Sequence, residues 1–432
     1  MERLVINTLV LLAIALSVVS HTYAQSNTQY QVEAADGAWC WFSDPRAVYH
    51  KGAHEKIYYS YINSQGDVVI SARDLKKSSG VQTFVLHEKL QIDDHNVPSI
   101  LFLPDGKILT FYTEHNGRFF MRKSLRPEDI SAWEEERTIS FGLADRMFCY
   151  SHPAMLSEED NRIYMFFRAV TPRVSHTGWG QYYSYSDDQG TTWTKGTYLL
   201  DTKAINNPPY LKVNSDSKSR IDILFTDGHP KIGPASVYHM YYEKGKFHRT
   251  NGEDIASLAD APLQLSNISK VYDASSKNTR SWIWDIAVDK KGRPVVAYAQ
   301  YPSVKDHIYH YAYWDGKRWI DEELINSGSY ITSPEKSGKV LEEHYSGGIV
   351  LDHHNPKNVF LSRQKDGVFE IEQWQLKGNK WKSKSITERS TSSNIRPYVV
   401  ADYPGADPMV MWMSGTYEHY VRYKTALMIY KP

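Results

Sequence analysis

The stretch that decides the fold is Ser186–Trp193, which reads SDDQGTTW and fits the pattern S-x-D-x-G-x-T-W. In this pattern Asp188 and Thr192 brace a tight hairpin, because short polar side chains can hydrogen bond across a turn. Gly190 takes the turn position, where a side chain would be strained, and Trp193 packs against a neighbouring sheet. The motif therefore predicts a β-hairpin in a protein of several sheets, and its role is structural rather than catalytic.

Short alternating strands recur along the chain, each closed by Gly, Asn or Asp, and no stretch reads as a long amphipathic helix. The predicted strands are Lys56–Tyr61, Lys107–Tyr112, Arg162–Arg168, Arg220–Phe225, Pro294–Ala299, Asn358–Arg363 and Pro408–Met413. Seven units spaced by roughly 50 to 60 residues predict an all-β fold, a seven-bladed β-propeller with four-stranded antiparallel blades. An array of β-sandwiches is the structural alternative.

Further features support one continuous domain. Two weaker copies of the hairpin motif, at Trp314–Trp319 and Trp374–Trp381, keep the Gly and Trp but lack the Asp. The polar segment Asn251–Asn278 is predicted to be a long loop between blades. Because no Pro- or Ser-rich linker divides the chain, residues 25–432 are expected to form a single propeller.

Residues 1–24 are predicted to be a signal peptide. Arg3 precedes an apolar run from Leu9 to Val19, and small residues ending at Ala24 offer a cleavage site. A transmembrane anchor is the alternative, but the run is short for spanning a bilayer. We therefore expect a periplasmic or secreted protein, without a membrane anchor and monomeric.

Composition narrows the class of partner. The chain has 432 residues with 50 Lys and Arg against 50 Asp and Glu, and this neutral balance argues against nucleic acid as the partner. The 12 Trp, 31 Tyr and 14 Phe suit half-buried strands and the flat faces of sugars. Two cysteines cannot form a disulfide scaffold, so Cys40 and Cys149 are expected to be buried free thiols.

Polar clusters open several of the predicted blades. Propellers bind ligands where the inner strands meet at the axis, so these clusters are expected to converge at one mouth. They are Asp93–Pro98, Tyr150–Pro153, Asn206–Tyr210, Arg280–Trp284, Glu343–Tyr345 and Asn394–Tyr398. Arg168, at the end of its strand, would point toward the same channel.

Structural roles remain open for each of these residues. His95 and His152 could satisfy buried backbone groups, Arg168 could form a buried ion pair, and Tyr210 could be core packing. Metal binding by the histidines is less favoured, because neither H-x-x-x-H nor C-x-x-C spacing occurs.

The segment Gly37–Tyr49, GAWCWFSDPRAVY, resembles the opening signature of the BNR-repeat propellers that act on carbohydrates. The segment Asp93–Gly106, DDHNVPSILFLPDG, is similar to the second-blade signature of that group. The group includes ulvan lyases, an ulvan oligosaccharide dehydratase and rhamnosidases that act on rhamnosyl-glucuronate. The resemblance implies an enzyme whose substrate is an anionic rhamnose-uronate oligosaccharide or polysaccharide, but it does not specify the reaction.

In the lyase members a His, a Tyr and an Arg act on a uronate, with a further Tyr nearby. By motif these functions fall on His95, Arg168 and Tyr210, while the lyase Tyr that precedes a Pro falls on His152. That departure leaves the acid and base assignment open. The residues expected to bind substrate are Asn96, Asn207, His229, Arg280, Trp284, His344, Tyr345 and Arg396.

These side chains suit elimination of the C4 substituent of a uronate. Arg168 would stabilise the enolate-like charge and His95 and His152 would move protons, so no metal or other cofactor is required, although a structural metal is compatible with the sequence. A sugar leaving group makes the enzyme a lyase, and a free hydroxyl makes it a dehydratase. The alternatives are an exo-α-L-rhamnosidase that uses His50 on the opposite face, or a non-catalytic glycan-binding propeller.

Overall fold

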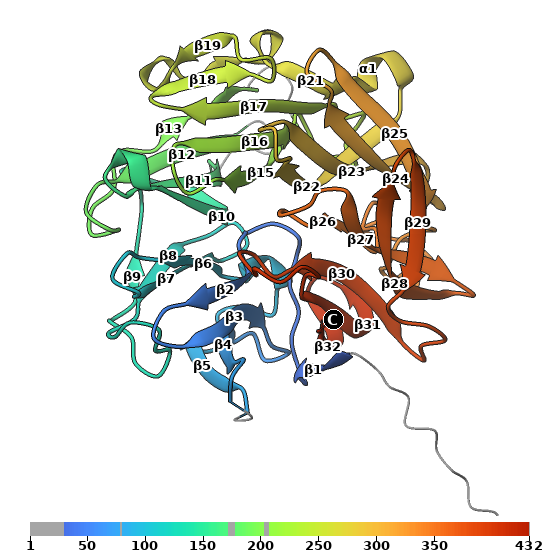
Figure 1. The fold of residues 1–432 in the computed structure, drawn as a ribbon, viewed down its shortest axis with the longest axis horizontal. Helices are drawn as coiled ribbons and strands as arrows, with labels where there is room; N and C mark the ends of the chain where they lie inside the picture. Colours follow the sequence, from blue (N-terminus) through green and yellow to red (C-terminus); the bar gives the residue numbers. More distant parts are fainter. Residues whose placement is uncertain (1–29, 78–79, 172–177, 203–206, 432) are drawn as a thin grey trace, which may run out of the picture.

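A computed structural model describes residues 30–77, 80–171, 178–202 and 207–431 of the chain. Within these ranges seven antiparallel sheets are arranged around a central axis (Figure 1), and two further short strands form a separate parallel pair. The fold is therefore the predicted seven-bladed β-propeller, and the β-sandwich alternative is wrong. The predicted signal peptide and Asn206 lie outside the described residues.

Each blade has four main strands, ordered from the axis outward, and the seven blades follow one another along the chain. The innermost strands are β2 (Ala47–Lys51), β6 (Ser99–Phe102), β10 (Met147–Leu156), β15 (Tyr210–Ser215), β22 (Arg280–Val288), β26 (Ile349–Leu351) and β30 (Ser393–Val399). The second strands are β3 (Glu55–Ile62), β7 (Ile108–Thr113), β11 (Arg162–Val170), β16 (Arg220–Thr226), β23 (Pro294–Ser303), β27 (Asn358–Lys365) and β31 (Val410–His419). The third strands are β4 (Val68–Asp74), β8 (Phe119–Lys123), β12 (Gly180–Ser186), β17 (Val237–Glu243), β24 (Asp306–Trp314), β28 (Val368–Lys377) and β32 (Arg422–Tyr430). The outer strands are β5 (Gln82–His87), β9 (Arg137–Thr138), β13 (Thr197–Tyr198), β18 (Lys246–Arg249), β25 (Trp319–Asn326), β29 (Lys380–Ser385) and β1 (Tyr30–Ala34).

Blade seven is built from both ends of the described chain. Its outer strand β1 pairs antiparallel with β32, and Tyr30 lies opposite Tyr430. The first described strand thus closes the ring against the last one. This pairing covers the outer edge of β32 and ties the two ends of the propeller together.

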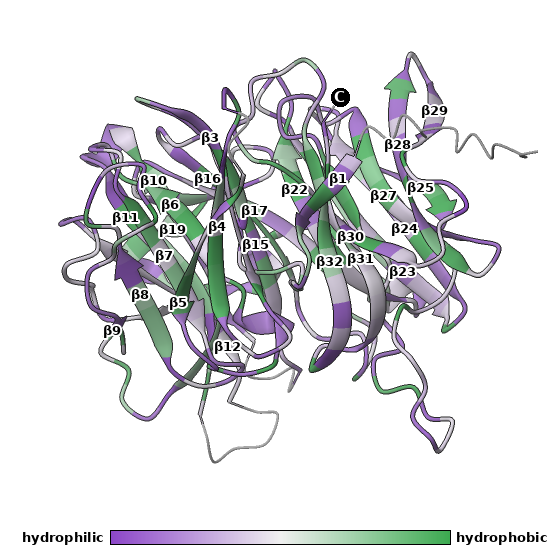
Figure 2. Ribbon diagram, turned by 90° about the horizontal axis from the view of Figure 1, so that it is seen from below, coloured by the Kyte–Doolittle hydropathy of each residue, from purple (hydrophilic) through white to green (hydrophobic). Residues whose placement is uncertain are grey.

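The seven strands predicted from alternating hydrophobicity all overlap the second strands of the blades. These strands are buried on both sides, as in β7 and β11, where nearly every residue is buried. Figure 2 shows the result, with hydrophobic residues concentrated in the strands and hydrophilic ones in many of the connecting loops. The cores therefore lie between neighbouring blades.

The SDDQGTTW hairpin has the predicted geometry. The Asp188 carboxylate accepts hydrogen bonds from the Thr192 amide at 2.8 Å and from the Thr192 hydroxyl at 2.7 Å. Gly190 adopts a φ of 85°, which explains the glycine. The Trp193 ring lies 5.9 Å from that of Phe111 in blade two, so the motif joins blades two and three.

The segment Asn251–Asn278 is more structured than predicted. It contains β19 (Asp254–Ser257), β20 (Leu263–Gln264) and β21 (Ser269–Tyr272), which pair with β18, with β14 (Leu200–Asp201) and with β17 respectively. Apolar side chains such as Leu263 and Ile268 pack on the core of blades three and four, which the polar composition concealed.

Helices are few and short in the described ranges. They are α1 (Ala274–Lys277) and the 3₁₀ turns η1 (Asp94–Asn96), η2 (Ser157–Glu159), η3 (Leu258–Asp260) and η4 (Leu265–Asn267). Among the described residues, none of these could cross a membrane.

Candidate active site

The central channel has two ends, and we call the end where the innermost strands begin the front mouth and the other end the back mouth. Residues 39–46, which we call the plug, lie between them. The Trp41 ring stacks on the Trp284 ring of blade five, with their centroids 4.6 Å apart. The centroid of the Phe42 ring lies 4.9 Å from that of Tyr150 in blade three. The Trp39 indole donates to the carbonyl of Arg396 in blade seven. Because one short segment reaches several blades, it must cross the channel.

A buried ion cluster holds the plug. The Lys212 ammonium donates to the carbonyls of Trp41 and Trp284 at 2.6 and 2.7 Å and pairs with Asp44 at 2.6 Å. Arg46 pairs with the other oxygen of Asp44 at 2.6 Å. The opening motif of the chain is therefore a channel plug with paired buried charges, the arrangement that makes burial of charge tolerable.

Side chains from blades two to six encircle the front side of the plug. Tyr150 lies 5.9 Å from Tyr210, Tyr210 lies 5.0 Å from Trp282, and Trp282 lies 5.9 Å from Tyr345, measured between ring centroids. The Tyr345 hydroxyl lies 3.3 Å from Nε2 of His95, and the His95 ring lies 5.9 Å from that of Tyr150. The front mouth is thus an aromatic ring with the plug as its floor.

Arg168 lies in this ring and is 3% exposed. Its guanidinium packs against the rings of Trp179 at 4.4 Å, Tyr210 at 4.6 Å and Tyr150 at 4.8 Å. Among the described residues its Nε and Nη1 atoms have no hydrogen-bond partner, and the groups that act most strongly on its pKa are Tyr210, Tyr150 and Cys149, none of them a carboxylate. Burial opposes its charge, but the pKa of Arg168 stays above its usual range, so the side chain is a buried cation without a protein anion.

His95 and His115 share one carboxylate. The Nδ1 atoms of His95 and His115 lie 2.7 and 2.8 Å from the two oxygens of Asp93. The two imidazole rings stack at 4.1 Å, and Tyr420 of blade seven packs edge-on against His95 at 4.8 Å. Since each Nδ1 faces a carboxylate oxygen, each Nε2 is directed away from Asp93.

The two imidazoles differ in charge. Burial opposes the cationic form of His95, but Asp93 and Asp94 outweigh it and raise the pKa of His95 to about 10. Burial and the neighbouring His95 cation lower the pKa of His115 below its usual value. At neutral pH the pair therefore holds one cation and one neutral imidazole.

A bulge in β10 decides which side chain of blade three enters the site. Cys149 lies opposite Arg168 and His152 lies opposite Phe166, so one extra residue is inserted between them. Tyr150 has a φ of 63° there. Tyr150 is therefore the residue that contacts His95, Arg168 and Tyr210.

His152 lies on the plug side instead. Among the described residues, the charges that act on it are Asp44, Lys212 and Arg46, and burial, only partly offset by Asp44, lowers its pKa to about 3. The residue that matches the lyase Tyr in the sequence, His152, thus supports the plug. The match relies on residue spacing, and spacing does not reveal the bulge.

The remaining predicted residues divide into two groups. His229 contacts Trp282 at 4.4 Å, and its amide donates to the Asn207 side chain at 2.6 Å, so both belong to the front mouth. Arg280 and His344 lie 3.3 Å apart at the rim of the same mouth. Together with His95, Arg168, Tyr210 and Tyr345, these residues meet at the front mouth.

Three residues predicted to bind substrate are covered by the plug or by neighbouring loops. Trp284 is stacked against the plug, Arg396 is fully buried in an ion pair with Asp94, and Asn96 is fully buried with its amide bonded to Gln91. Their positions in the blade openings were predicted correctly, but the plug and neighbouring loops cover them.

Sequence reasoning missed four side chains that form the site. Tyr150 stands out in the sequence only as part of a blade opening, and His115, Trp179 and Tyr420 lie in front-face hairpins. Only the topology of the propeller indicates that these residues reach the site. The second and third strands of every blade are joined on the front face, so the hairpins between them lie there.

Asp93, His95 and His115 are also the described residues that could hold a metal ion, with ligand atoms within 4.8 Å of one another. Their Nδ1 atoms are already satisfied by the Asp93 carboxylate. The three side chains are therefore already joined by hydrogen bonds, with Asp93 between the two imidazoles.

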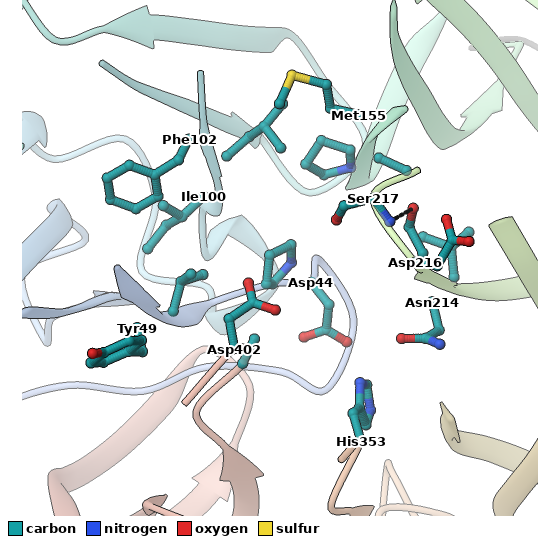
Figure 3. A pocket seen from close by; sticks show the side chains of 18 of the residues that line it. Asp44, Tyr49, Ile100, Phe102, Met155, Asn214, Asp216, Ser217, His353 and Asp402 are labelled. Atoms are coloured by element: carbon teal, nitrogen blue, oxygen red, sulfur yellow. Dashed lines mark hydrogen bonds between the residues drawn. The ribbon is translucent and has the colours of Figure 1, made fainter. Parts of the chain in front are cut away.

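A separate pocket of ≈ 470 Å³ opens at the back mouth (Figure 3). Asp44, Asn214, His353 and Asp402 line it, and so does His50. The His50 ring stacks on Phe102 at 3.9 Å, and burial lowers its pKa. His50 thus lies on the opposite side of the plug from His95.

The fold and the front mouth define a closed seven-bladed propeller with a cationic, aromatic-lined site. Residues 56–327 match the model of the BNR repeat-containing family, and the chain belongs to that family. A search of curated proteins finds no match.

Solved structures agree on the fold. A polysaccharide lyase of family PL25, an ulvan lyase, is 16% identical with a TM-score of 0.67, covering 92% of this chain and 95% of that one. A structure of such a lyase bound to -[GlcA(1-4)Rha3S]- is 15% identical with the same TM-score and the same coverage. The polysaccharide lyase Uly1 is 12% identical with a TM-score of 0.55, covering 93% of this chain and 97% of that one.

Proposed function

We propose that this protein eliminates the C4 substituent of a uronic acid in rhamnose-uronate, ulvan-type oligosaccharides, leaving a 4,5-unsaturated uronate. The observation that carries the proposal is Arg168, a buried guanidinium with no carboxylate partner among the described residues. A buried charge is costly unless it is paired, and a planar guanidinium matches a carboxylate with two hydrogen bonds. The oligosaccharide in the similar PL25 structure contains a glucuronate.

The reaction breaks the C5–H and C4–O4 bonds and forms a C4=C5 double bond. Removal of H5 places negative charge on the carboxylate and its enolate-like form. Arg168 and the imidazolium of His95 would stabilise that charge, and their burial strengthens the interaction. Tyr210 packs against Arg168 and would keep the guanidinium oriented.

Two neutral groups are available for proton transfer. His115 has its Nδ1 on Asp93, so in the neutral tautomer that donates to Asp93 its Nε2 carries the lone pair of a base. Tyr150 retains its proton because burial raises its pKa well above the usual value. We assign removal of H5 to His115 and protonation of O4 to Tyr150. These assignments replace the acid or base function of His152.

The leaving group separates two versions of the reaction. If O4 carries a sugar, the chain is cut and the enzyme is a lyase; if O4 is a free hydroxyl at the non-reducing end, water leaves and the enzyme is a dehydratase. Incubation with defined ulvan oligosaccharides, followed by ultraviolet absorbance and product mass, distinguishes them. Absence of a double bond in every product would contradict both.

A second candidate is favoured by the back-mouth pocket. His50 lines it, and so do His353 and Asp402 beside the ionised Asp44 (Figure 3). An exo-α-L-rhamnosidase acting there would release rhamnose without forming a double bond, and the activity would depend on His50. Equilibrium binding of the oligosaccharide without turnover would instead indicate a non-catalytic glycan-binding propeller. In each case we propose a monomer that acts in the periplasm or outside the cell.

A further inference from the structure

Three buried side chains from separate parts of the chain meet beneath His95. Asp94 precedes His95 in η1, Arg396 is in β30, and Tyr417 is in β31. Nη1 of Arg396 and the Tyr417 hydroxyl each lie 2.5 Å from Oδ2 of Asp94. Nη2 of Arg396 donates to the Tyr417 hydroxyl at 2.8 Å, which closes the cluster. Asp94 and Arg396 are fully buried.

Arg396 also contacts the plug and blade six. Its Nη1 donates to the Trp39 carbonyl at 2.6 Å, and its guanidinium lies 5.1 Å from the Trp41 ring and 5.3 Å from the Tyr345 ring. Its backbone has a φ of 53°, which is unfavourable for a residue with a side chain. Such strain persists only where the surroundings enforce it and often accompanies function.

Asp94 faces in two directions. Its Oδ2 is taken by Arg396 and Tyr417, while its Oδ1 lies 3.1 Å from Nδ1 of His95. That oxygen is buried, and no other contact satisfies it among the described residues. Asp93 holds the same Nδ1 at 2.7 Å. If the Arg396 and Tyr417 side chains moved, the Asp94 carboxylate that they hold would move with them. Its negative charge lies directly beside the His95 imidazole.

We propose that Asp94, Arg396 and Tyr417 form a clamp that positions the His95 imidazole to face the substrate carboxylate. The clamp acts through His95 and touches no substrate, so its members are positioning residues; this inference rests on the proposed function. Arg396 thus serves the site from beneath instead of binding substrate.

Several other groups face His95 and must be considered in its titration. They are Asp93 in its own turn, His115 in the β7–β8 hairpin, Tyr150 in β10, Tyr345 before β26, and His419 and Tyr420 in the β31–β32 hairpin. Asp94→Asn replaces none of these side chains, although the Asp94 charge also acts on Tyr345, His419 and Tyr420, so a change in the titration of His95 reports on the loss of the Asp94 charge from the clamp.

The test uses three variants of the full chain. Asp94→Asn keeps the shape of the clamp but removes its charge, and Tyr417→Phe removes one hydroxyl. Tyr59→Phe is the matched control, because its buried hydroxyl bonds to Glu33 in the β1–β3 region, outside the front mouth. NMR titration of His95 is measured without substrate, and kcat and KM are measured with the proposed uronate substrate.

In Asp94→Asn we expect the pKa of His95 to fall by about one unit, since the loss of a close carboxylate disfavours the cation. In Tyr417→Phe we expect kcat to fall about tenfold with KM nearly unchanged, which is roughly the effect of one charged hydrogen bond. Tyr59→Phe should match wild type in both measurements after correction for the folded fraction.

An unchanged His95 titration in Asp94→Asn would overturn the clamp, even if the variant were less stable. Equal losses of rate in Tyr417→Phe and Tyr59→Phe would also overturn it, since they would indicate general destabilisation. A shifted titration without turnover by wild type would instead support the clamp and contradict the proposed function.

Discussion

The imidazole rings of His95 and His115 lie stacked, 4.1 Å apart and 11° from parallel, on a single carboxylate from Asp93. Two basic groups this close cannot both carry a proton without strong repulsion, so their pKa values separate. At neutral pH the pair thereby holds one cation and one neutral imidazole within one small site.

This separation predicts a broad pH profile. His115 must be neutral, so kcat/KM should rise on the acid side with an apparent pKa below 6.5. His95 must be cationic, so the rate should fall again as the pH passes about 10. The check is a measurement of kcat/KM against pH. In Asp93→Asn we expect the alkaline limb of the profile to move to lower pH, which narrows the profile.

The His95 shift also bears on stability. Its pKa is higher in the folded protein than the ordinary value of 6.5, so its contribution is full below pH 6.5 and is lost as the pH rises through about 10. Thermal unfolding across that window should show a larger decline in wild type than in His95→Gln. Parallel declines in the two proteins would contradict the assigned charge.

Replacement of Tyr150 tests the effect of the bulge. Tyr150→Phe should keep the fold and lose about 10² to 10⁴ in turnover, the usual contribution of general acid catalysis. His152→Asn should mainly lower the melting temperature, because His152 lies beside the plug ion cluster. The reverse pattern, with turnover per folded molecule lost only in His152→Asn, would restore His152 as the acid or base.

The two mouths can be separated by one pair of variants. His95→Ala should abolish most of the elimination, whereas His50→Ala should retain it, since His50 faces the back-mouth pocket. Both proteins are compared on the same oligosaccharide after their folding is confirmed. Selective loss of activity in His50→Ala would move the chemistry to the back mouth and favour the rhamnosidase.

The hairpin that indicates the fold should be separable from the site. Asp188→Ala removes bonds to the amide and hydroxyl of Thr192, so we expect a loss of about 1–2 kcal/mol in the free energy of unfolding. The rate per folded molecule should stay at the wild-type level, because the hairpin that contains Asp188 lies far from the front mouth. Calorimetry and turnover on one preparation provide the check.

The sequence predicted the blades well because their signals are local. Alternating hydrophobicity in the second strands and the SDDQGTTW hairpin need no knowledge of distant residues. The convergence of His95, Arg168 and Tyr210 followed from their blade-opening or strand-end positions.

Other features depend on contacts between distant segments. Trp284 and Arg396 are covered by the plug, which comes from the start of the described chain, and their burial is not visible in their own neighbourhoods. The inserted residue near Tyr150 turns His152 away, and a single extra residue in a strand leaves no mark on spacing. His115 was missed because only the hairpin topology brings it to His95.

The most direct test of the central claim is a thermodynamic cycle in which Arg168 and the carboxylate of the substrate are changed separately and together. kcat/KM is measured for wild type and Arg168→Lys, each on a native uronate oligosaccharide and on its carboxyl-reduced form. Lys keeps the charge but lacks the planar fork, so on the native substrate we expect a loss of about 10² to 10³. On the reduced substrate wild type and variant should be nearly equal, whereas equal losses on both substrates, or none on either, would contradict Arg168 as the carboxylate receptor.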